Sequence, residues 1–171
     1  MKIFAARMDS TLHTAWLLTG SNLNDREQSL ARARELLEVH GCRVKKISSL
    51  YETASWGKED EPPYLNQALE IETALNARQL MRHILKIEKA MGRIRKEKYA
   101  ARIIDIDILL YGQEKHFYDL LKLPHPEIPN RRFVLEPMNE IAPDLNHPVL
   151  QKTMHELLIA CTDPLPVKKY S

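Results

Sequence analysis

The sequence predicts a single α+β domain in which helices cover an antiparallel β-sheet. Three observations support this class: two segments with helical spacing of apolar residues, apolar strand-like segments around each of them, and turn residues where the segments meet. In chain order they read strand, helix, strand, strand, helix, strand. This is the order of a ferredoxin-like βαββαβ core. Additional C-terminal strands and helices predict a second helical layer, and hence a three-layer α-β-α sandwich.

An apolar run and the turn that follows it in the sequence predict the first strand and the first helix. Residues 15–19 are a short apolar strand, which stops at the Gly20-Ser-Asn22 turn. Asn24 and Glu27 resemble a capping box at the start of a helix over 25–39, whose apolar residues share one side. A glycine-containing turn between strand and helix lets the backbone approach another group closely.

The middle of the core contains two more strands and the second helix. Segment 44–51 alternates imperfectly and is predicted as one strand, and segment 64–73 is predicted as another. The connection 53–63 is long for a hairpin, and long loops are often functional. Asn76 caps a helix that runs to about Met91, with an apolar stripe along one face.

The last part of the chain is predicted as short elements. Residues 93–101 are charged and irregular, and residues 116–123 hold one or two short strands. A short helix or turn is expected at 130–137 and a final helix at 153–160. Residues 161–171 are predicted as a C-terminal tail.

Composition indicates a cytoplasmic globular protein. The 171 residues suffice for one domain, and 44% hydrophobic with 28% charged residues is ordinary for such a chain. Cys42 and Cys161 show no CxxC spacing, which favours a reducing compartment. No apolar run approaches the roughly 20 residues of a membrane helix. We therefore expect residues 1–171 to form a single domain, with an N-terminal extension at 1–13, no membrane partner and a monomeric state.

The most informative segment is the strand 102–112, which carries two aspartates. Because side chains alternate along a strand, Asp105 and Asp107 lie on one face, roughly 7 Å apart at Cα. The predicted faces are Ile104, Ile106, Ile108 and Leu110 on one side and Asp105, Asp107, Leu109 and Tyr111 on the other. Two solvated aspartates on an edge strand are one interpretation. The other is a Mg²⁺ site, since paired carboxylates suit a hard cation and five Lys/Arg between residues 93 and 102 favour a phosphate ligand.

Several motifs in this order resemble the 6-hydroxymethyl-7,8-dihydropterin pyrophosphokinase family, over roughly residues 16–157. The sharpest is the Arg102-x-x-Asp-x-Asp strand that ends at Gly112. The others are Gly20-Ser-Asn-Leu23, Ser49-x-Tyr51-x-Thr53 with Gly57, Tyr64-Leu-Asn66, Ile87-Glu88 with Gly92-Arg-x-Arg95, Pro124-His125, and Arg131-x-Phe133 with Leu135-x-Pro137.

The resemblance implies transfer of pyrophosphate from ATP to the hydroxymethyl group of the pterin, with release of AMP, in folate biosynthesis. It implies that Asp105 and Asp107 hold two Mg²⁺ ions, and that Arg93, Arg95 and Asp107 take part in catalysis. The residues it assigns to ATP are Glu88, Arg93, Arg95, Arg102, Ile108, His125 and Arg131. Those it assigns to the pterin are Thr53, Trp56, Tyr64, Asn66 and Phe133, with the aromatic rings stacking on the heterocycle.

Three other functions compete with this one. A ferredoxin-like sheet with a basic segment also fits an RNA-binding module, although the sheet aromatics that stack on RNA bases are missing. A catalytically inactive relative is disfavoured because Asn66, Asp105, Asp107 and His125 are all present. The third is an enzyme of the same fold that uses ATP to act on another alcohol. We expect small-molecule partners, ATP and the pterin, and no nucleic acid.

Overall fold

The computed structural model of the chain describes residues 11–55, 60–93 and 102–171. Its helices are α1 (Arg26–Val39), α2 (Ala77–Ala90), α3 (Arg132–Ile141) and α4 (Met154–Ala160), with a 3₁₀ turn η1 (Ile128–Asn130) before α3. Its strands are β1 (His13–Ser21), β2 (Cys42–Ile47), β3 (Tyr51–Thr53), β4 (Tyr64–Thr73), β5 (Asp105–Tyr111), β6 (His116–Tyr118), β7 (Leu121–Leu123) and β8 (Val167–Lys169). None of these helices has the length and apolar character needed to span a bilayer.

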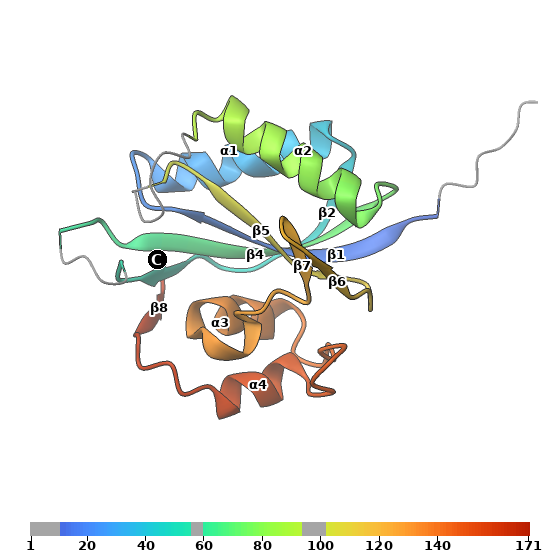
Figure 1. Cartoon of the computed structure of the whole chain (residues 1–171). Coiled ribbons are helices and arrows are strands. Elements are labelled where there is room, and N and C mark those ends of the chain that lie inside the picture. The colour runs from blue at the N-terminus through green and yellow to red at the C-terminus, as the bar shows by residue number, and fades with distance from the viewer. Residues whose placement is uncertain (1–10, 56–59, 94–101) are drawn as a thin grey trace, which may run out of the picture.

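The main sheet confirms the predicted βαββαβ core and its antiparallel pairing. Its strand order is β5-β1-β4-β3-β8, and β2 also pairs with β4. Figure 1 shows α1 and α2 on one face of this sheet and α3 and α4 on the other. The predicted three-layer sandwich is therefore confirmed, and β6 and β7 form a separate hairpin at the side.

Two apolar cores hold the three layers together. Alternate residues of β1 enter different cores: Ala15 and Leu17 pack toward α1 and α2, whereas Trp16 and Leu18 pack toward α3 and α4. Both cores contain strand residues that are almost fully buried. The central strands are thus covered on both faces, which explains why β1 reads as a continuous apolar run.

The predicted single strand over 44–51 is wrong, because the structure divides it into β2 and β3. Both strands pair with β4, and the break falls at Ser48. There the Ser48 hydroxyl accepts a hydrogen bond from Ala68 N at 2.9 Å, and the Gln67 side chain donates to Ser48 O at 2.9 Å. Side-chain hydrogen bonds therefore satisfy the backbone where the strand is interrupted.

The alternation predicted for the aspartate strand also fails near its end. The pairing of β5 with β1 shifts register between Trp16 and Leu17. Leu109 and Leu110 consequently both pack toward α3 and α4, and Tyr111 turns to the opposite core. This is the effect of a β-bulge, which adds one residue to one strand. The bulge lies after Asp105 and Asp107, so these two residues keep the common face that alternation predicts.

The first helix cap is one residue later than predicted. Asp25, rather than Asn24, is the N-cap of α1, and its carboxylate accepts a hydrogen bond from Gln28 N at 3.0 Å. Asn24 instead has a φ of 55°, a left-handed conformation that asparagine tolerates better than most residues. The predicted cap of α2 by Asn76 is confirmed, as a complete capping box.

The segment predicted as a C-terminal tail is part of the fold. Residues 167–169 form β8, which pairs antiparallel with β3 and extends the main sheet at that edge. Tyr170 N continues the pairing by donating to Leu50 O at 2.8 Å. At the other end of the chain, β1 begins at His13, the last residue of the predicted N-terminal extension.

Candidate active site

A cavity of about 270 Å³ opens on the sheet face that α3 covers. This is close to the lower limit of roughly 300 Å³ for small-molecule sites. Its lining combines sheet residues, α3 residues and loop residues: Leu18, Gly20, Thr53, Ala54, Ser55, Glu61, Tyr64, Asn66, Arg102, Asp105, Asp107, Arg131, Phe133 and Leu165. One side of this lining is strongly charged, and the other carries aromatic and amide groups.

Strand pairing places the two kinds of group in one row. Gly20 in β1 pairs with Asp105 in β5 on one side and with Asn66 in β4 on the other. Since neighbouring strands lie about 4.8 Å apart, Asp105 and Asn66 are separated by roughly 10 Å at Cα. Gly20 keeps the space between them open, because a Cβ there would lie 2.7 Å from the Asn66 Oδ1.

The amide and aromatic side of the cavity contains four of the five residues predicted for the pterin. Thr53, Tyr64, Asn66 and Phe133 all line it, and the fifth, Trp56, lies outside the described residues. Asn66 is 5% exposed, and its Nδ2 donates to Thr53 Oγ1 at 3.1 Å. This contact fixes the orientation of the amide, which then offers a defined edge to a ligand.

Three neighbouring acids lie at the charged side, Asp105 and Asp107 in the cavity lining and Glu88 close to them. Burial and the nearby carboxylates of Asp105 and Glu88 raise the pKa of Asp107 to about 8. Burial is also the main cause that raises the pKa of Glu88, and the Arg93 charge opposes it. Carboxylates placed so close together in a half-buried site need positive charge to be stable as anions.

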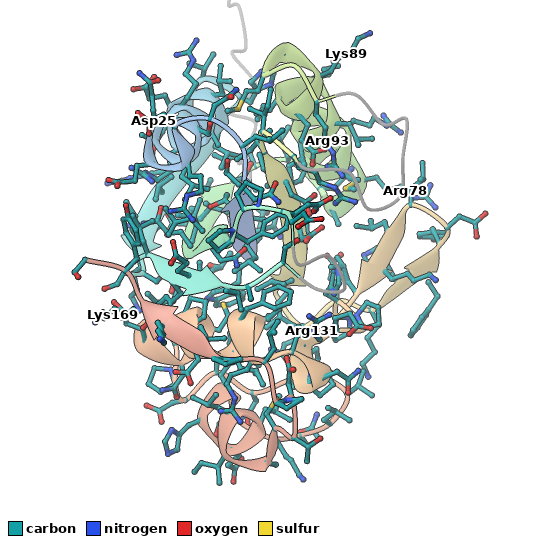
Figure 2. All side chains as sticks on the ribbon, turned by 90° about the vertical axis from the view of Figure 1, so that its left-hand side faces the viewer. Asp25, Arg78, Lys89, Arg93, Arg131 and Lys169 are labelled. Carbon is teal, nitrogen blue, oxygen red and sulfur yellow. The ribbon has the colours of Figure 1, made fainter. Side chains whose placement is uncertain are left out.

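Two arginines supply part of that charge through Asp105. Arg93 Nη1 lies 2.9 Å from Asp105 Oδ1, and Arg102 Nη1 lies 2.9 Å from Asp105 Oδ2. Arg93 also pairs with Glu88. Figure 2 shows Arg93 on the α2 side of the sheet and Arg131 on the α3 side, so cationic groups approach the site from both layers. Arg95, the remaining predicted arginine of this group, lies outside the described residues.

Glu88 organises the start of β5 as well as the arginine. It is 2% exposed, and its Oε1 accepts a hydrogen bond from Ile106 N at 3.2 Å. The same carboxylate forms the ion pair with Arg93. A buried acid near the end of α2 thus binds two groups. One is the β5 backbone at Ile106, between the two aspartates, and the other is Arg93, which also contacts Asp105.

The donor set fits Mg²⁺ if further ligands come from outside the protein. Among the described residues, no three His, Cys, Asp or Glu side chains are arranged to hold a metal ion. Asp105 and Asp107 therefore supply two carboxylates at most from this part of the chain. That number is typical of Mg²⁺ sites, in which substrate phosphates and waters complete the oxygen shell. The acids that raise the pKa of Asp107 are the groups that a bound cation would neutralise.

Four of the described residues predicted for ATP do not line the cavity: Glu88, Arg93, Ile108 and His125. Ile108 is 4% exposed and its side chain belongs to the core beneath α1 and α2, so its assignment to ATP stays a prediction. His125 is not among the described residues that line the cavity. Its backbone N–H donates to Leu109 O at 2.9 Å, and its Nδ1 accepts from Glu127 N at 3.2 Å. The neutral ring therefore carries its proton on Nε2, the nitrogen that remains able to donate.

Asn22 connects two loop ends beside the cavity and was not predicted as a site residue. Its backbone N–H donates to Arg102 O at 3.1 Å, and its Oδ1 accepts from Arg102 N at 2.7 Å. Its Nδ2 donates to Pro62 O at 3.3 Å. The signal for Asn22 in the sequence was the polar turn after β1. In the structure Asn22 is buried, with an exposed fraction of 1%.

The other unpredicted lining residues come from irregular segments. Ser55 and Glu61 belong to the loop between β3 and β4, and the Ser55 hydroxyl lies 3.1 Å from Glu61 Oε2. Leu18 reaches the cavity from β1, and Leu165 reaches it from the C-terminal segment. No motif marked these positions, because their place in the site depends on how distant segments pack.

A ferredoxin-like sheet that brings paired aspartates and arginines next to an aromatic pocket defines a phosphoryl-transferring enzyme that acts on a small flat substrate. The comparison with known families identifies which one. The family model for 7,8-dihydro-6-hydroxymethylpterin-pyrophosphokinase matches residues 16–143, and the chain belongs to this family.

Relatives with the same enzyme name cover most of the chain. The 2-amino-4-hydroxy-6-hydroxymethyldihydropteridine pyrophosphokinase of Aquifex aeolicus is 41% identical over 143 residues, which are 84% of this chain and 89% of that protein. The Bacillus subtilis protein of the same name is 42% identical over 128 residues, or 74% and 77% of the two chains.

A solved structure supports the fold. The crystal structure of Plasmodium falciparum HPPK-DHPS wild type with STZ-DHP superposes with a TM-score of 0.71 at 18% identity. The match covers 88% of this chain and 43% of that one, so the chain spans less than half of the larger protein. At this identity the likeness concerns the fold alone.

Proposed function

We propose that this chain transfers the pyrophosphoryl group of ATP to the hydroxymethyl oxygen of 6-hydroxymethyl-7,8-dihydropterin, giving AMP and the pterin diphosphate in folate biosynthesis. The observation that carries the proposal is the row Asp105–Gly20–Asn66 across three strands. It supports the proposal because a carboxylate proposed to act on the phosphates and an amide proposed to recognise the ring share one cavity, about 10 Å apart. Family membership supports the same reaction.

The pterin lies between Tyr64 and Phe133, whose rings stack on its two faces. Asn66 and Thr53 recognise its polar edge, and the hydrogen bond between them selects one orientation of the amide. Trp56 belongs to the same group in this proposal. A flat heterocycle held in this way points its hydroxymethyl group toward Asp105 and Asp107, at the other end of the row.

The phosphates of ATP lie on the charged side of the cavity. Arg93, Arg95, Arg102 and Arg131 bind or steer them, since guanidinium groups match phosphate oxygens with two parallel hydrogen bonds. His125 donates from Nε2 to a phosphate oxygen. Glu88 acts through Arg93, whose position it fixes, and is a positioning residue.

Asp105 and Asp107 hold two Mg²⁺ ions in this proposal. Bound Mg²⁺ supplies charge neutralisation along the phosphate chain and polarises the phosphoryl group. The carboxylates themselves position the ATP phosphates against the pterin hydroxyl. Their high local negative charge makes the site dependent on cation binding.

The reaction then needs alignment more than covalent participation by the protein. The hydroxymethyl oxygen bonds to the β-phosphorus of ATP, while the bond from that phosphorus to the oxygen bridging the α-phosphorus breaks. AMP leaves with that oxygen, and the hydroxyl proton is released. Arg93 and Arg95 stabilise the charge that develops on the transferred group, and Asp107 lies nearest the reacting oxygen.

Product analysis tests this function directly. The full chain is incubated with MgATP and 6-hydroxymethyl-7,8-dihydropterin, and the nucleotides are separated. We expect AMP and the pterin diphosphate in equal amounts, and neither when magnesium is chelated. ADP in place of AMP would identify an ordinary kinase, and ATP left intact would exclude both reactions.

The proposal further includes a cytoplasmic location and a monomeric single domain with ATP and the pterin as its partners. Sedimentation of the purified chain with and without both substrates tests the monomer. A dimer that forms at assay concentration would contradict it.

A further inference from the structure

The C-terminal segment reaches the substrate cavity from beyond the matched family region. The family match ends at residue 143, and Leu165 lies in the cavity lining with Tyr64 and Phe133. The segment 161–165 leads from α4 to β8, and β8 is paired with β3, which contributes Thr53 to the same cavity. Both ends of the segment are thus fixed to elements of the fold (Figure 1).

Asp163 gives this segment its shape. Its Oδ1 accepts a hydrogen bond from Leu165 N at 3.1 Å, which closes a turn that carries the Leu165 side chain. Its Oδ2 accepts from Arg132 N at 3.1 Å and lies 3.3 Å from Arg131 Nε. These hydrogen bonds and the arginine charge hold the pKa of Asp163 below its ordinary value.

The same contacts tie Asp163 to the pterin side of the cavity. The guanidinium carbon of Arg131 lies 4.7 Å from the centroid of the Phe133 ring, a cation–π distance. Arg132 adds a second connection, since its side chain donates to Asp163 O at 3.4 Å and to Cys161 O at 3.0 Å. Asp163 therefore fixes the position of Arg131 over Phe133 and the position of Leu165 in one arrangement (Arg131 is labelled in Figure 2).

We infer that segment 161–165 is part of the pterin-binding site, with Leu165 as an apolar wall and Asp163 as a positioning residue for Arg131 and Leu165. This inference rests on the proposed function and adds a substrate-contacting segment to it. Leu165 contacts the heterocycle through its methyl groups. It gains binding energy from the apolar area that the ligand covers, and it limits the size of a substituent on that side of the ring.

Leu165→Ala tests the wall, with Val167→Ala as the matched control. Val167 lies two residues later, is also half-buried, and does not line the cavity. We expect Leu165→Ala to raise both KM and Kd for 6-hydroxymethyl-7,8-dihydropterin about tenfold, the effect of an apolar group lost from a binding pocket. The KM for ATP and kcat should stay within twofold, and Val167→Ala should match the wild type in all four constants.

Asp163→Asn tests the positioning role. The amide can keep an oxygen toward Arg131 and Arg132, but its NH₂ then faces Leu165 N, so the turn opens. We expect the KM for the pterin to rise as it does in Leu165→Ala, and the double variant to be no worse than either single one. A merely structural Asp163 would lower Tm and leave the KM for the pterin unchanged.

The outcomes separate the two proposals. Wild-type enzyme that makes AMP while Leu165→Ala keeps the wild-type KM for the pterin overturns the inference and leaves the function standing. Wild-type enzyme that makes no AMP overturns the function, and with it this assignment. Additive effects in the double variant overturn the positioning role of Asp163.

Discussion

Gly20→Ala is expected to damage pterin recognition through a single contact. A Cβ at this position would lie 2.7 Å from Asn66 Oδ1, whereas Asn66 Cγ and Tyr64 Cδ1 would both be at an ordinary 3.8 Å. The amide oxygen must therefore retreat by roughly 0.7 Å to reach normal van der Waals separation. Gly20 has no positive φ, so the effect is steric and not a matter of backbone strain.

The expected magnitude follows from what Asn66 loses. Its hydrogen bond to Thr53 Oγ1, now 3.1 Å, is broken or bent, at a cost of about 1 kcal/mol in the free energy of unfolding. The effect on binding is larger, because a displacement of about 1 Å in a positioned group can cost up to 100-fold. We expect the KM for the pterin to rise 10- to 100-fold, with the KM for ATP little changed.

A double-mutant cycle isolates the contact. Steady-state assays that measure AMP are run on Gly20→Ala, Asn66→Ala and the double variant. If the new methyl group acts through Asn66, it has nothing left to displace in Asn66→Ala, and the effects are strongly non-additive. Additive losses, or a Gly20→Ala enzyme with the wild-type KM for the pterin, would refute the steric reasoning.

Three further predictions concern other parts of the site and the fold. Asp107→Asn should abolish most AMP formation yet raise Tm, since the buried Asp107 must take up a proton on folding or carry a charge next to two other acids; a variant that turns over normally would contradict the metal role. Asn22→Ala removes the acceptor of Arg102 N and the donor to Pro62 O, so we expect a loss of about 1–3 kcal/mol in urea unfolding together with a lower kcat/KM. His147 is 5% exposed, and burial lowers its pKa. The unfolded state then binds more protons as pH falls below about 6.5, so stability decreases from pH 7.5 toward pH 5. Equal pH slopes of urea unfolding in wild type and His147→Asn would exclude this contribution.

Much of the fold follows from local patterns in the sequence. Strand β4 was predicted with the bounds it has, and the buried residues of α1, Leu30, Ala33 and Leu37, lie on one side of the helix, as the predicted helical spacing requires. The common face of Asp105 and Asp107 follows from alternation alone, because the bulge at Leu109 comes later in the strand. Such features depend on residues a few positions apart, which a single sequence displays.

The features that were missed depend on distant partners. The register shift in β5 arises where it pairs with Trp16 and Leu17, far away in the chain. Strand β8 has only three residues, two of them lysines, and becomes a strand because β3 offers it a free edge. Leu165 stands between two prolines and reads as coil, so nothing local indicates that it lines the cavity.

The site depends most on the part of the chain that is hardest to predict. The βαββαβ core provides Gly20, Asn66 and the two aspartates on one sheet face, but a sheet face alone is a surface and not a cavity. The cavity exists because α3 and the segment after α4 cover that face, contributing Phe133 and Leu165 among others. Substitutions in this covering layer should therefore change substrate affinity more than turnover, whereas substitutions in β5 should do the reverse, since the reacting phosphates lie along β5 in the proposed reaction.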